Sequence, residues 1–99
     1  MLPTVISAAT MRRVLSTADF DDKVERVLFA CPRGREALRG LIQVIRHSPQ
    51  EQGMAVRGRP GYRCRPIHPQ PDRSFLVVYT FDEDSVILID VREVPSSAY

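Results

Sequence analysis

Residues Ser74 to Val94, read SFLVVYTFDEDSVILIDVREV, decide the fold of this chain. Two runs of β-branched, aromatic and aliphatic residues flank a short acidic step at 82–85, a pattern that predicts a β-hairpin. One face is expected to be apolar throughout and to lie on the core: Phe75, Val77, Tyr79, Phe81, Ile87, Ile89 and Val91. The other face begins apolar and becomes charged, and we interpret it as the working surface: Leu76, Val78, Thr80, Leu88, Asp90 and Arg92.

The length and composition fit one soluble domain. The chain has 99 residues, enough to bury a single modest core, and its hydrophobic and charged contents of 43% and 26% are typical of globular proteins. No apolar run approaches the roughly 20 residues that a membrane-spanning helix needs. The start, MLPTVISAATMRR, lacks the order of a signal peptide. We therefore expect a cytoplasmic protein with no membrane partner.

The two cysteines are isolated in the sequence. Neither Cys31 nor Cys64 has a second cysteine or a histidine at metal-ligand spacing. One disulfide would be compatible with two cysteines, but a reducing compartment favours free, buried thiols. We expect no metal site and no cofactor.

Basic and acidic residues are separated along the chain. Residues 57–73 hold five arginines and one aspartate, whereas residues 80–94 hold five acids and one arginine. Thirteen of the fourteen basic residues are arginine, the type suited to bidentate phosphate contact. A general preference for arginine over lysine along the whole chain would produce the same proportion of arginines. The proportion therefore does not single out any one arginine as functional.

The first half of the chain predicts a short strand and two helices. Residues 1–10 carry no periodic pattern and are expected to form a flexible extension, with a strand at 12–16. Asp19 is interpreted as a helix cap, and proline and glycine at 31–34 end the helix that follows. A second helix is expected from about 35 to 47. The apolar stripes of the two helices are Phe20, Val24, Val27, Leu28, Cys31 and Leu38, Leu41, Ile42, Ile45.

The second half predicts strands. Residues 49–61 are typical of a loop, and residues 62–67 alternate like a half-buried strand until the proline-rich segment 66–71 breaks it. The order is therefore β-α-α-β-β-β. This is an α+β fold in which a two-helix hairpin packs on one face of a small antiparallel sheet. We assign residues 11–99 to a single domain.

That order, the strand run FLVVYTFDEDSVILIDVREV and the terminal Tyr99 resemble the RelE/ParE superfamily of bacterial toxins. The resemblance covers residues 11–99. It implies the toxin component of a toxin–antitoxin pair, held inactive by a small acidic antitoxin that wraps it with a helix or an added strand. A homodimer is left open.

In the branch that resembles RelE, the toxin enters the ribosome and cleaves messenger RNA. The 2′-hydroxyl of the RNA attacks the neighbouring phosphate, basic residues neutralise that phosphate, and an aromatic residue stacks on a base. The resemblance implies four catalytic residues: Arg65, Arg73, Arg92 and Tyr99. Leu76 stands where the family's third strand often carries an arginine, which weakens the case for an endoribonuclease.

Further residues are candidates for binding. Arg57, Arg59, Arg63 and Arg65 are expected either to bind RNA or to form a solvated face. Arg92 either binds phosphate or pairs with a neighbouring acid. Tyr79 is expected to be structural. His68, in a proline-flanked loop, is either a general acid or base or a bystander.

The aliphatic part of the working surface predicts a partner-binding site at Leu76, Val78 and Leu88, because exposed aliphatic side chains on a sheet face usually contact something. An antitoxin segment, a second copy or residues 1–10 would cover it. Two other functions stay open. One is a ParE-like, non-enzymatic inhibitor of DNA gyrase, which does not need the missing arginine; the other is a non-toxic protein-interaction relative.

Overall fold

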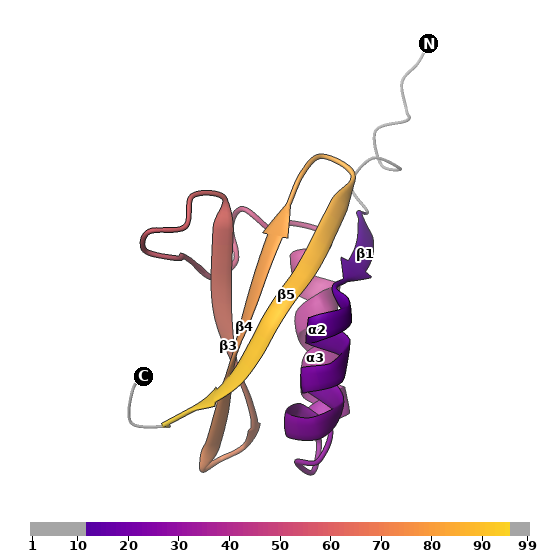
Figure 1. Cartoon of the computed structure of the whole chain (residues 1–99), viewed down its shortest axis with the longest axis vertical. Coiled ribbons are helices and arrows are strands. Elements are labelled where there is room, and N and C mark those ends of the chain that lie inside the picture. Colours follow the sequence, from indigo (N-terminus) through magenta and orange to yellow (C-terminus); the bar gives the residue numbers. More distant parts are fainter. Residues whose placement is uncertain (1–11, 96–99) are drawn as a thin grey trace.

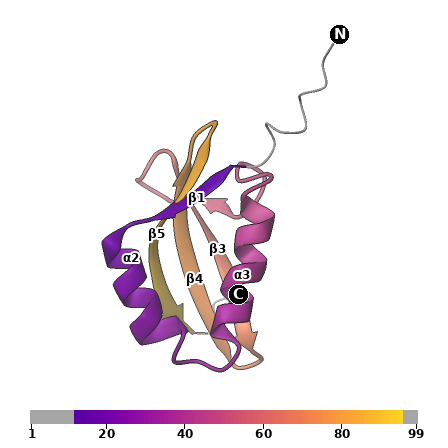
Figure 2. The same ribbon diagram turned by 90° about the vertical axis from the view of Figure 1, so that its right-hand side faces the viewer.

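The computed structural model describes residues 12–95. Two helical segments pack on one face of a five-stranded sheet (Figures 1 and 2). The elements in chain order are β1 (Arg13–Ser16), α2 (Ala18–Lys23), the π-helical turn η1 (Val24–Leu28), α3 (Gly34–Ile45), β2 (Met54–Ala55), β3 (Tyr62–Gln70), β4 (Arg73–Phe81) and β5 (Ser85–Val94). The predicted α+β fold is confirmed. No helix within these residues is long and apolar enough to cross a bilayer.

The sheet is mixed. Its strand order is β1-β5-β4-β3-β2, and β1 runs parallel to β5 while the other neighbouring pairs are antiparallel. A parallel pair needs a long crossover connection, and here both helices and three strands lie between the two partners in the sequence. The prediction of a purely antiparallel sheet is corrected in this respect, and the two-residue β2 was missed inside the predicted loop.

The first helix begins two residues earlier than the sequence indicated. Thr17 is the N-cap, and its Oγ1 accepts a hydrogen bond from the backbone N–H of Phe20 at 3.1 Å. Asp19 therefore lies in the first turn, where its negative charge interacts favourably with the backbone N–H groups that have no partner within the helix. The helix ends at Leu28, and a turn with Arg33 in the left-handed region (φ 68°) leads into α3.

Gly34 allows the two helices to approach closely. A Cβ atom at this position would lie 2.1 Å from the carbonyl oxygen of Leu28. A residue with a side chain would therefore clash with the end of the preceding helix, which explains the glycine. Gly34 is also the first residue of α3, whereas the sequence indicated only that it ends the helix before it.

Strand β3 continues through Pro66 and Pro69, which corrects the predicted break at 66–71. Because β2 pairs only with Arg63 and Cys64, the second half of β3 forms an edge of the sheet. Proline lacks an N–H donor but is tolerated at an edge.

A β-bulge in β5 changes which residues face the helices. Val78 pairs with Asp90 and Tyr79 with Leu88, so Ile89 is the extra residue. Leu88 and Val91 are both buried although they are three residues apart, whereas Ile87 and Ile89 are half-buried. The prediction had Ile87 and Ile89 on the core face and Leu88 on the working surface. Those assignments are wrong because strict alternation does not survive a bulge.

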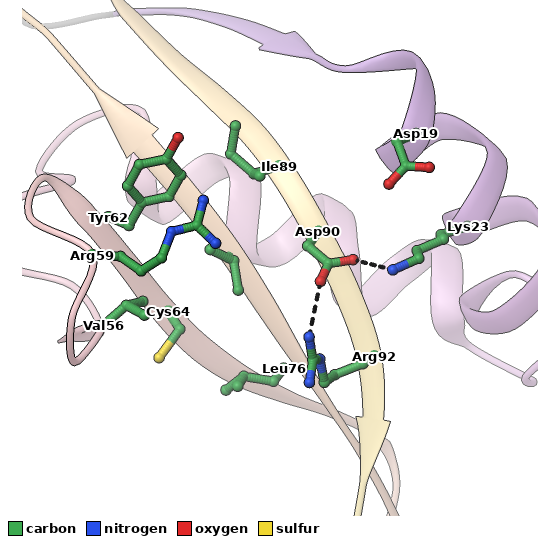
Figure 3. A pocket seen from close by; sticks show the side chains of 11 residues that line it. Asp19, Lys23, Val56, Arg59, Tyr62, Cys64, Leu76, Ile89, Asp90 and Arg92 are labelled. Carbon is green, nitrogen blue, oxygen red and sulfur yellow. Dashed lines mark hydrogen bonds and ion pairs between the residues drawn. The ribbon is translucent and has the colours of Figure 1, made fainter.

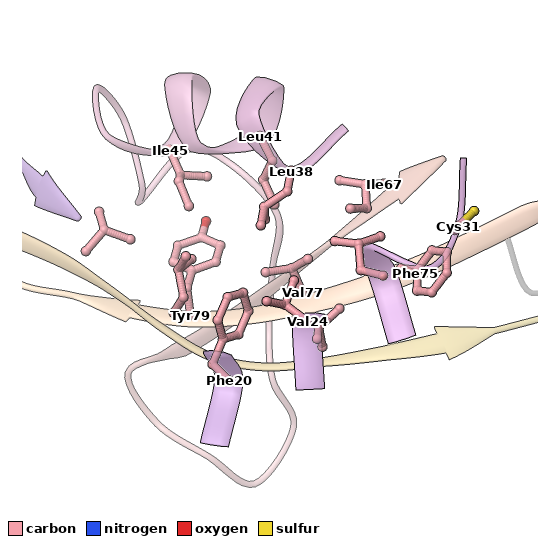
Figure 4. Close-up of a cluster of buried hydrophobic side chains, with 14 residues drawn as sticks. Phe20, Val24, Cys31, Leu38, Leu41, Ile45, Ile67, Phe75, Val77 and Tyr79 are labelled. Carbon is pink, nitrogen blue, oxygen red and sulfur yellow. The ribbon is translucent and has the colours of Figure 1, made fainter. Parts of the chain in front are cut away.

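The core lies between the helices and the sheet (Figure 4). The predicted stripes of both helices supply one side of it, and β4 supplies the centre. Its buried members are Phe20, Val24, Leu28, Cys31, Leu38, Leu41, Ile45, Ile67, Phe75, Val77, Tyr79, Val86, Leu88 and Val91. Among residues 12–95 no helix packs on the opposite side of the sheet (Figure 1), and this outer sheet face is where the candidate site lies.

Candidate functional site

The outer sheet face is mostly apolar. Strand register arranges its side chains in three rows that cross the strands: Leu15, Ile87, Thr80, Tyr62; then Asp90, Val78, Cys64, Met54; then Arg92, Leu76, Pro66. The bulge adds Ile89 beside the second row. Leu15 and Met54, at the two ends of these rows, are 44% and 55% exposed. This face therefore corresponds to the working surface predicted from the hairpin. Leu76 and Val78 lie on it, whereas Leu88 is buried in the core.

A hollow of about 370 Å³ opens on the outer sheet face (Figure 3). It lies between α2, the middle of β5 and the segment 56–62, which precedes and begins β3. Its floor is aliphatic, and its rim carries three cations and two carboxylates. The lining residues are Asp19, Lys23, Val56, Arg59, Tyr62, Cys64, Leu76, Val78, Ile89, Asp90 and Arg92.

Asp90 holds two of the three cations. Its Oδ1 accepts a hydrogen bond from Lys23 Nζ at 2.7 Å, and its Oδ2 accepts one from Arg92 Nη2 at 3.3 Å. The carboxylate is 19% exposed, whereas the side chain of Arg92 is 66% exposed. Burial raises the pKa of the Asp90 carboxyl, but its hydrogen bonds to Lys23 and Arg92 outweigh that effect and its pKa is lowered. Asp90 is therefore ionised at neutral pH.

Arg59 is the third cation, and it stacks on Tyr62. Its guanidinium carbon lies 4.4 Å from the ring centroid. Backbone bonds from Val56 N–H to Tyr62 O (3.0 Å) and from Tyr62 N–H to Arg59 O (3.1 Å) close the turn that carries the pair. Among the ion pairs of residues 12–95, none involves Arg59.

Arg63 and Arg65 lie on the helix side of the sheet. Their register partners are Tyr79 and Val77, which belong to the core. Arg63 donates through Nε to Gln52 O (3.0 Å) and through Nη2 to Gly53 O (2.9 Å), and Arg65 donates to the side chain of Gln52. The two arginines therefore clasp the loop before β2 and do not line the hollow.

Tyr79 belongs to the same clasp. It is fully buried, and its hydroxyl lies 2.8 Å from Pro49 O and 2.6 Å from Gln52 O, so its one O–H hydrogen is shared between these two carbonyl acceptors. Burial raises the pKa of the Tyr79 hydroxyl, although the nearby Arg63 acts in the opposite direction. The prediction that Tyr79 is structural agrees with this environment.

Arg73 is bound in a different ion pair. It donates to both carboxylate oxygens of Glu93, at 2.9 and 3.0 Å, and lies 5.5 Å from the ring centroid of Phe75. The hydrogen bond from Arg73 lowers the pKa of the Glu93 carboxyl. Phe75 faces the core, so Arg73 lies on the helix side of the sheet, and the predicted arginine cluster is not formed. Of the arginines expected to share a phosphate, only Arg92 lines the hollow, where it lies with Arg59.

The remaining predicted residues fall in several places. Arg57 is exposed in the turn before β3. His68 lies within β3 rather than in a loop, with Nδ1 2.9 Å from Ser74 Oγ, and it does not line the hollow. Cys31 and Cys64 are free thiols, but only Cys31 is buried as predicted, whereas Cys64 is half-buried. Tyr99 and the proposed extension at residues 1–10 lie outside the described residues.

The predicted site residues do not include seven of those that line the hollow, although Asp90 was expected on the working surface: Asp19, Lys23, Val56, Tyr62, Cys64, Ile89 and Asp90. Lys23 is the only lysine of the chain, a signal that would have distinguished it. Tyr62 and Cys64 alternate with Arg63 and Arg65, so the sequence did indicate that they share one face. It did not indicate which face is outer.

Comparison with known proteins supports the fold. No protein-family model matches the chain, and no curated protein is similar to it in sequence. The chain has the fold of the RelE-like toxins.

The solved structures with this fold include the YafQ toxin of E. coli. In the E. coli DinJ–YafQ toxin–antitoxin complex the TM-score is 0.57 at 14% identity, over 89% of this chain and 96% of that chain. A second DinJ–YafQ complex gives 0.56 at 15% identity, over 88% and 96%. YafQ from E. coli strain BL21(DE3) gives 0.55 at 16% identity, over 88% and 96%.

Proposed function

We propose that this protein is the toxin of a toxin–antitoxin pair and that it inhibits translation in the cytoplasm by cleaving messenger RNA at the ribosome. Its partner is a small acidic antitoxin. The fold it shares with YafQ supports the class. The observation that carries the proposal is the hollow on the outer sheet face, where Lys23, Arg59 and Arg92 surround an open site that holds one aromatic ring, Tyr62.

The lining residues suit cleavage that uses the RNA's own nucleophile. Arg92 and Lys23 would bind the phosphate that is attacked, and the Arg59–Tyr62 pair would receive a base by stacking. The 2′-oxygen forms a bond to phosphorus and its proton passes to a carboxylate. The bond from phosphorus to the 5′-oxygen breaks, and that oxygen takes a proton from water, which leaves a 2′,3′-cyclic phosphate and a free 5′-hydroxyl. Asp90 is the ionised carboxylate between the two phosphate-binding cations, which makes it the candidate acceptor. This step uses no metal or cofactor.

A second candidate is the ParE-like, non-enzymatic inhibitor of DNA gyrase. Two features favour it: the floor of the hollow carries Leu76 where a third-strand arginine is often found in the family, and Asp90 already neutralises two of the three cations. An aliphatic floor with paired charges suits a protein surface better than a phosphate.

Controlled expression in bacterial cells separates these functions. We expect growth arrest with messenger RNA cut at ribosome-dependent sites. Intact messages with supercoiling defects would instead support the gyrase inhibitor, and unimpaired growth would support a non-toxic interaction protein.

Variants of the site then test the residues. Arg92→Ala and Arg59→Ala should each reduce cleavage by roughly 10²-fold, the usual cost of losing one charge-stabilising group. Arg39→Ala is the matched control, because Arg39 is exposed on α3 and distant from the outer sheet face. Equal cleavage by all three variants would contradict the assignment.

A further inference from the structure

We propose that the hollow on the outer sheet face is a guanosine phosphate site, in which the Asp19 carboxylate reads the edge of the base. The inference rests on the proposed function, since it names the nucleotide unit that this same hollow would take from an RNA strand. A free guanosine nucleotide presents the same groups, and the binding experiment separates the two sources.

Two charged side chains of the lining are not used within the fold. Asp19 and Arg59 are exposed and take part in none of the ion pairs of residues 12–95. Asp90, by contrast, is occupied by Lys23 and Arg92. A carboxylate only accepts hydrogen bonds and a guanidinium only donates them. A ligand that suits the hollow therefore offers N–H donors to Asp19 and a π-face to Arg59.

One end of the hollow has the groups that hold a nucleobase. Arg59 and Tyr62 lie on its β3 side and Asp19 on its α2 side, with Ile89 between them (Figure 3). Bases of single-stranded RNA stack on tyrosine rings and on arginine guanidinium groups. The half-buried Ile89 offers a base an apolar contact from the sheet. A base stacked on the Arg59–Tyr62 pair would therefore turn one edge toward Asp19.

The carboxylate selects guanine among the four bases of RNA. Guanine presents two adjacent donors, N1–H and N2–H₂, which match the two oxygens of a carboxylate. Adenine and cytosine place a ring nitrogen acceptor beside their amino group, and uracil places its single N–H between two carbonyls. Each of these three bases would therefore bring an acceptor against the negative charge of Asp19.

The other end of the hollow has the groups that hold a phosphate. Arg92 makes one hydrogen bond to Asp90, at 3.3 Å, from a guanidinium that carries five N–H donors, and its side chain is 66% exposed. The ammonium of Lys23 likewise has donors beyond the one that Asp90 accepts. From Ile89 to Arg92 the strand rises by about 10 Å, which leaves room for the ribose. The hollow of about 370 Å³ also has the size of a small-ligand site.

Asp19 also stabilises the first turn of α2, so the test needs a comparison within that turn. Asp21 provides it, because it lies in the same turn but does not line the hollow. Its Oδ1 accepts a hydrogen bond from Ser16 Oγ at 2.6 Å, which an asparagine oxygen can also accept. A role in the helix alone predicts the same response from both aspartates, whereas reading of a base involves only Asp19.

Binding of ligands that cannot be cleaved tests the proposal on the ¹⁵N-labelled full chain. The first arm compares guanosine and adenosine 5′-monophosphates. The second compares the 2′-O-methyl oligonucleotides UUGUU and UUAUU, which lack the attacking hydroxyl. We expect guanine to bind roughly tenfold more tightly than adenine in at least one arm, with shifted amides at 59–62 and 87–92. Preference in the first arm identifies a free nucleotide as a source, and preference in the second arm alone identifies RNA.

Base analogues identify the edge that is read. 7-Deazaguanine keeps N1–H and N2–H₂ and should bind like guanine, whereas the methyl group of 1-methylguanine blocks that edge and should weaken binding roughly tenfold. The opposite order would show recognition through N7 and would overturn the role of Asp19.

Variants identify the residue. Asp19→Asn should remove or reverse the preference for guanine, because a carboxamide matches a donor beside an acceptor, as adenine presents. Asp19 is exposed, so the variant is expected to fold. Asp21→Asn is the control and should keep the preference. Equal binding of guanine and adenine by the parent in both arms, an unchanged preference in Asp19→Asn, the same loss in both variants, or no binding at millimolar ligand would each overturn the proposal.

The two proposals fail separately. A protein that cleaves messenger RNA but binds guanine and adenine equally contradicts the guanosine site alone. A protein that prefers guanine but leaves growth and RNA intact contradicts the toxin activity alone.

Discussion

Lys23 Nζ lies 2.7 Å from Asp90 Oδ1, which joins helix α2 to the bulge of β5 at the rim of the hollow. The same carboxylate reaches Arg92, so two cations from different elements are held together before any ligand arrives. A site preorganised in this way loses less conformational freedom on binding an anion. This arrangement of Lys23 and Arg92 persists only while the Asp90 carboxylate is ionised.

Asp90→Asn should lower the free energy of unfolding at pH 7 by about 1 kcal/mol, because a partly buried pair loses its charge. The pKa of Asp90 is lowered in the folded state, so its contribution is present above the pKa of the unfolded chain and is lost as pH falls through the folded value. Urea unfolding of parent and variant at pH 7 and in acid should therefore give curves that differ at pH 7 and converge in acid.

Asp22→Asn provides the matched control. Asp22 pairs with Arg26 on the exposed side of the helix, where both side chains are more than half exposed. Such a pair contributes only about 0.3–0.5 kcal/mol. An Asp90→Asn variant that is no less stable at pH 7 than Asp22→Asn would contradict the role given to Asp90.

Tyr79→Phe should destabilise the protein by about 1–3 kcal/mol, because the carbonyls of Pro49 and Gln52 lose a buried donor. The loop that Arg63 and Arg65 also hold should then exchange its amide hydrogens faster. Hydrogen exchange and thermal unfolding measure the two effects. Tyr62→Phe, on the half-exposed outer face, is the control and should change stability by less than about 0.5 kcal/mol. Unchanged exchange in the loop of Tyr79→Phe would rule out the clasp.

Two glycines should respond to alanine in opposite directions. Gly40 lies within α3 with nothing within 4 Å of an added Cβ, so Gly40→Ala should stabilise the protein by about 0.5–1 kcal/mol. Gly34→Ala places a Cβ 2.1 Å from Leu28 O and should destabilise it by at least about 2 kcal/mol. Denaturant midpoints compare them, and a stable Gly34→Ala variant would show that the close approach of the helices is not required.

The helices and the central hairpin could be predicted because their apolar periodicity reports burial directly. Phe20, Val24 and Leu28 recur at helical spacing and are all buried. The β1–β5 pairing could not be predicted, since nothing in either segment encodes a partner some seventy residues away. The bulge at Ile89 was equally hidden, because a run of Val, Ile and Leu alternates acceptably in either register.

The sequence predicts the site only in part, because the charge of a segment does not show how its side chains divide between the two faces of the sheet. Arg63 and Arg65 contribute to a basic segment of sequence, yet both are used to hold backbone and amide groups of the loop before β2. Arg92 and Arg59 face the other side of the sheet. The alternation of Tyr62 with Arg63 indicates that these two side chains point to opposite faces of the sheet. The sequence does not show which of the two faces the helices cover.

The structure separates two ways in which an arginine variant can lose toxicity. Arg92→Ala should abolish growth arrest with little change in stability, because its side chain is 66% exposed at the hollow. Arg65→Ala should weaken toxicity only through the loosened loop. Adding Gly40→Ala, which restores about 0.5–1 kcal/mol, should therefore recover toxicity in Arg65→Ala and not in Arg92→Ala. Growth curves, with the soluble amount and unfolding midpoint of each variant, measure this difference; rescue of both variants, or of neither, would show that the outer sheet face does not carry the activity.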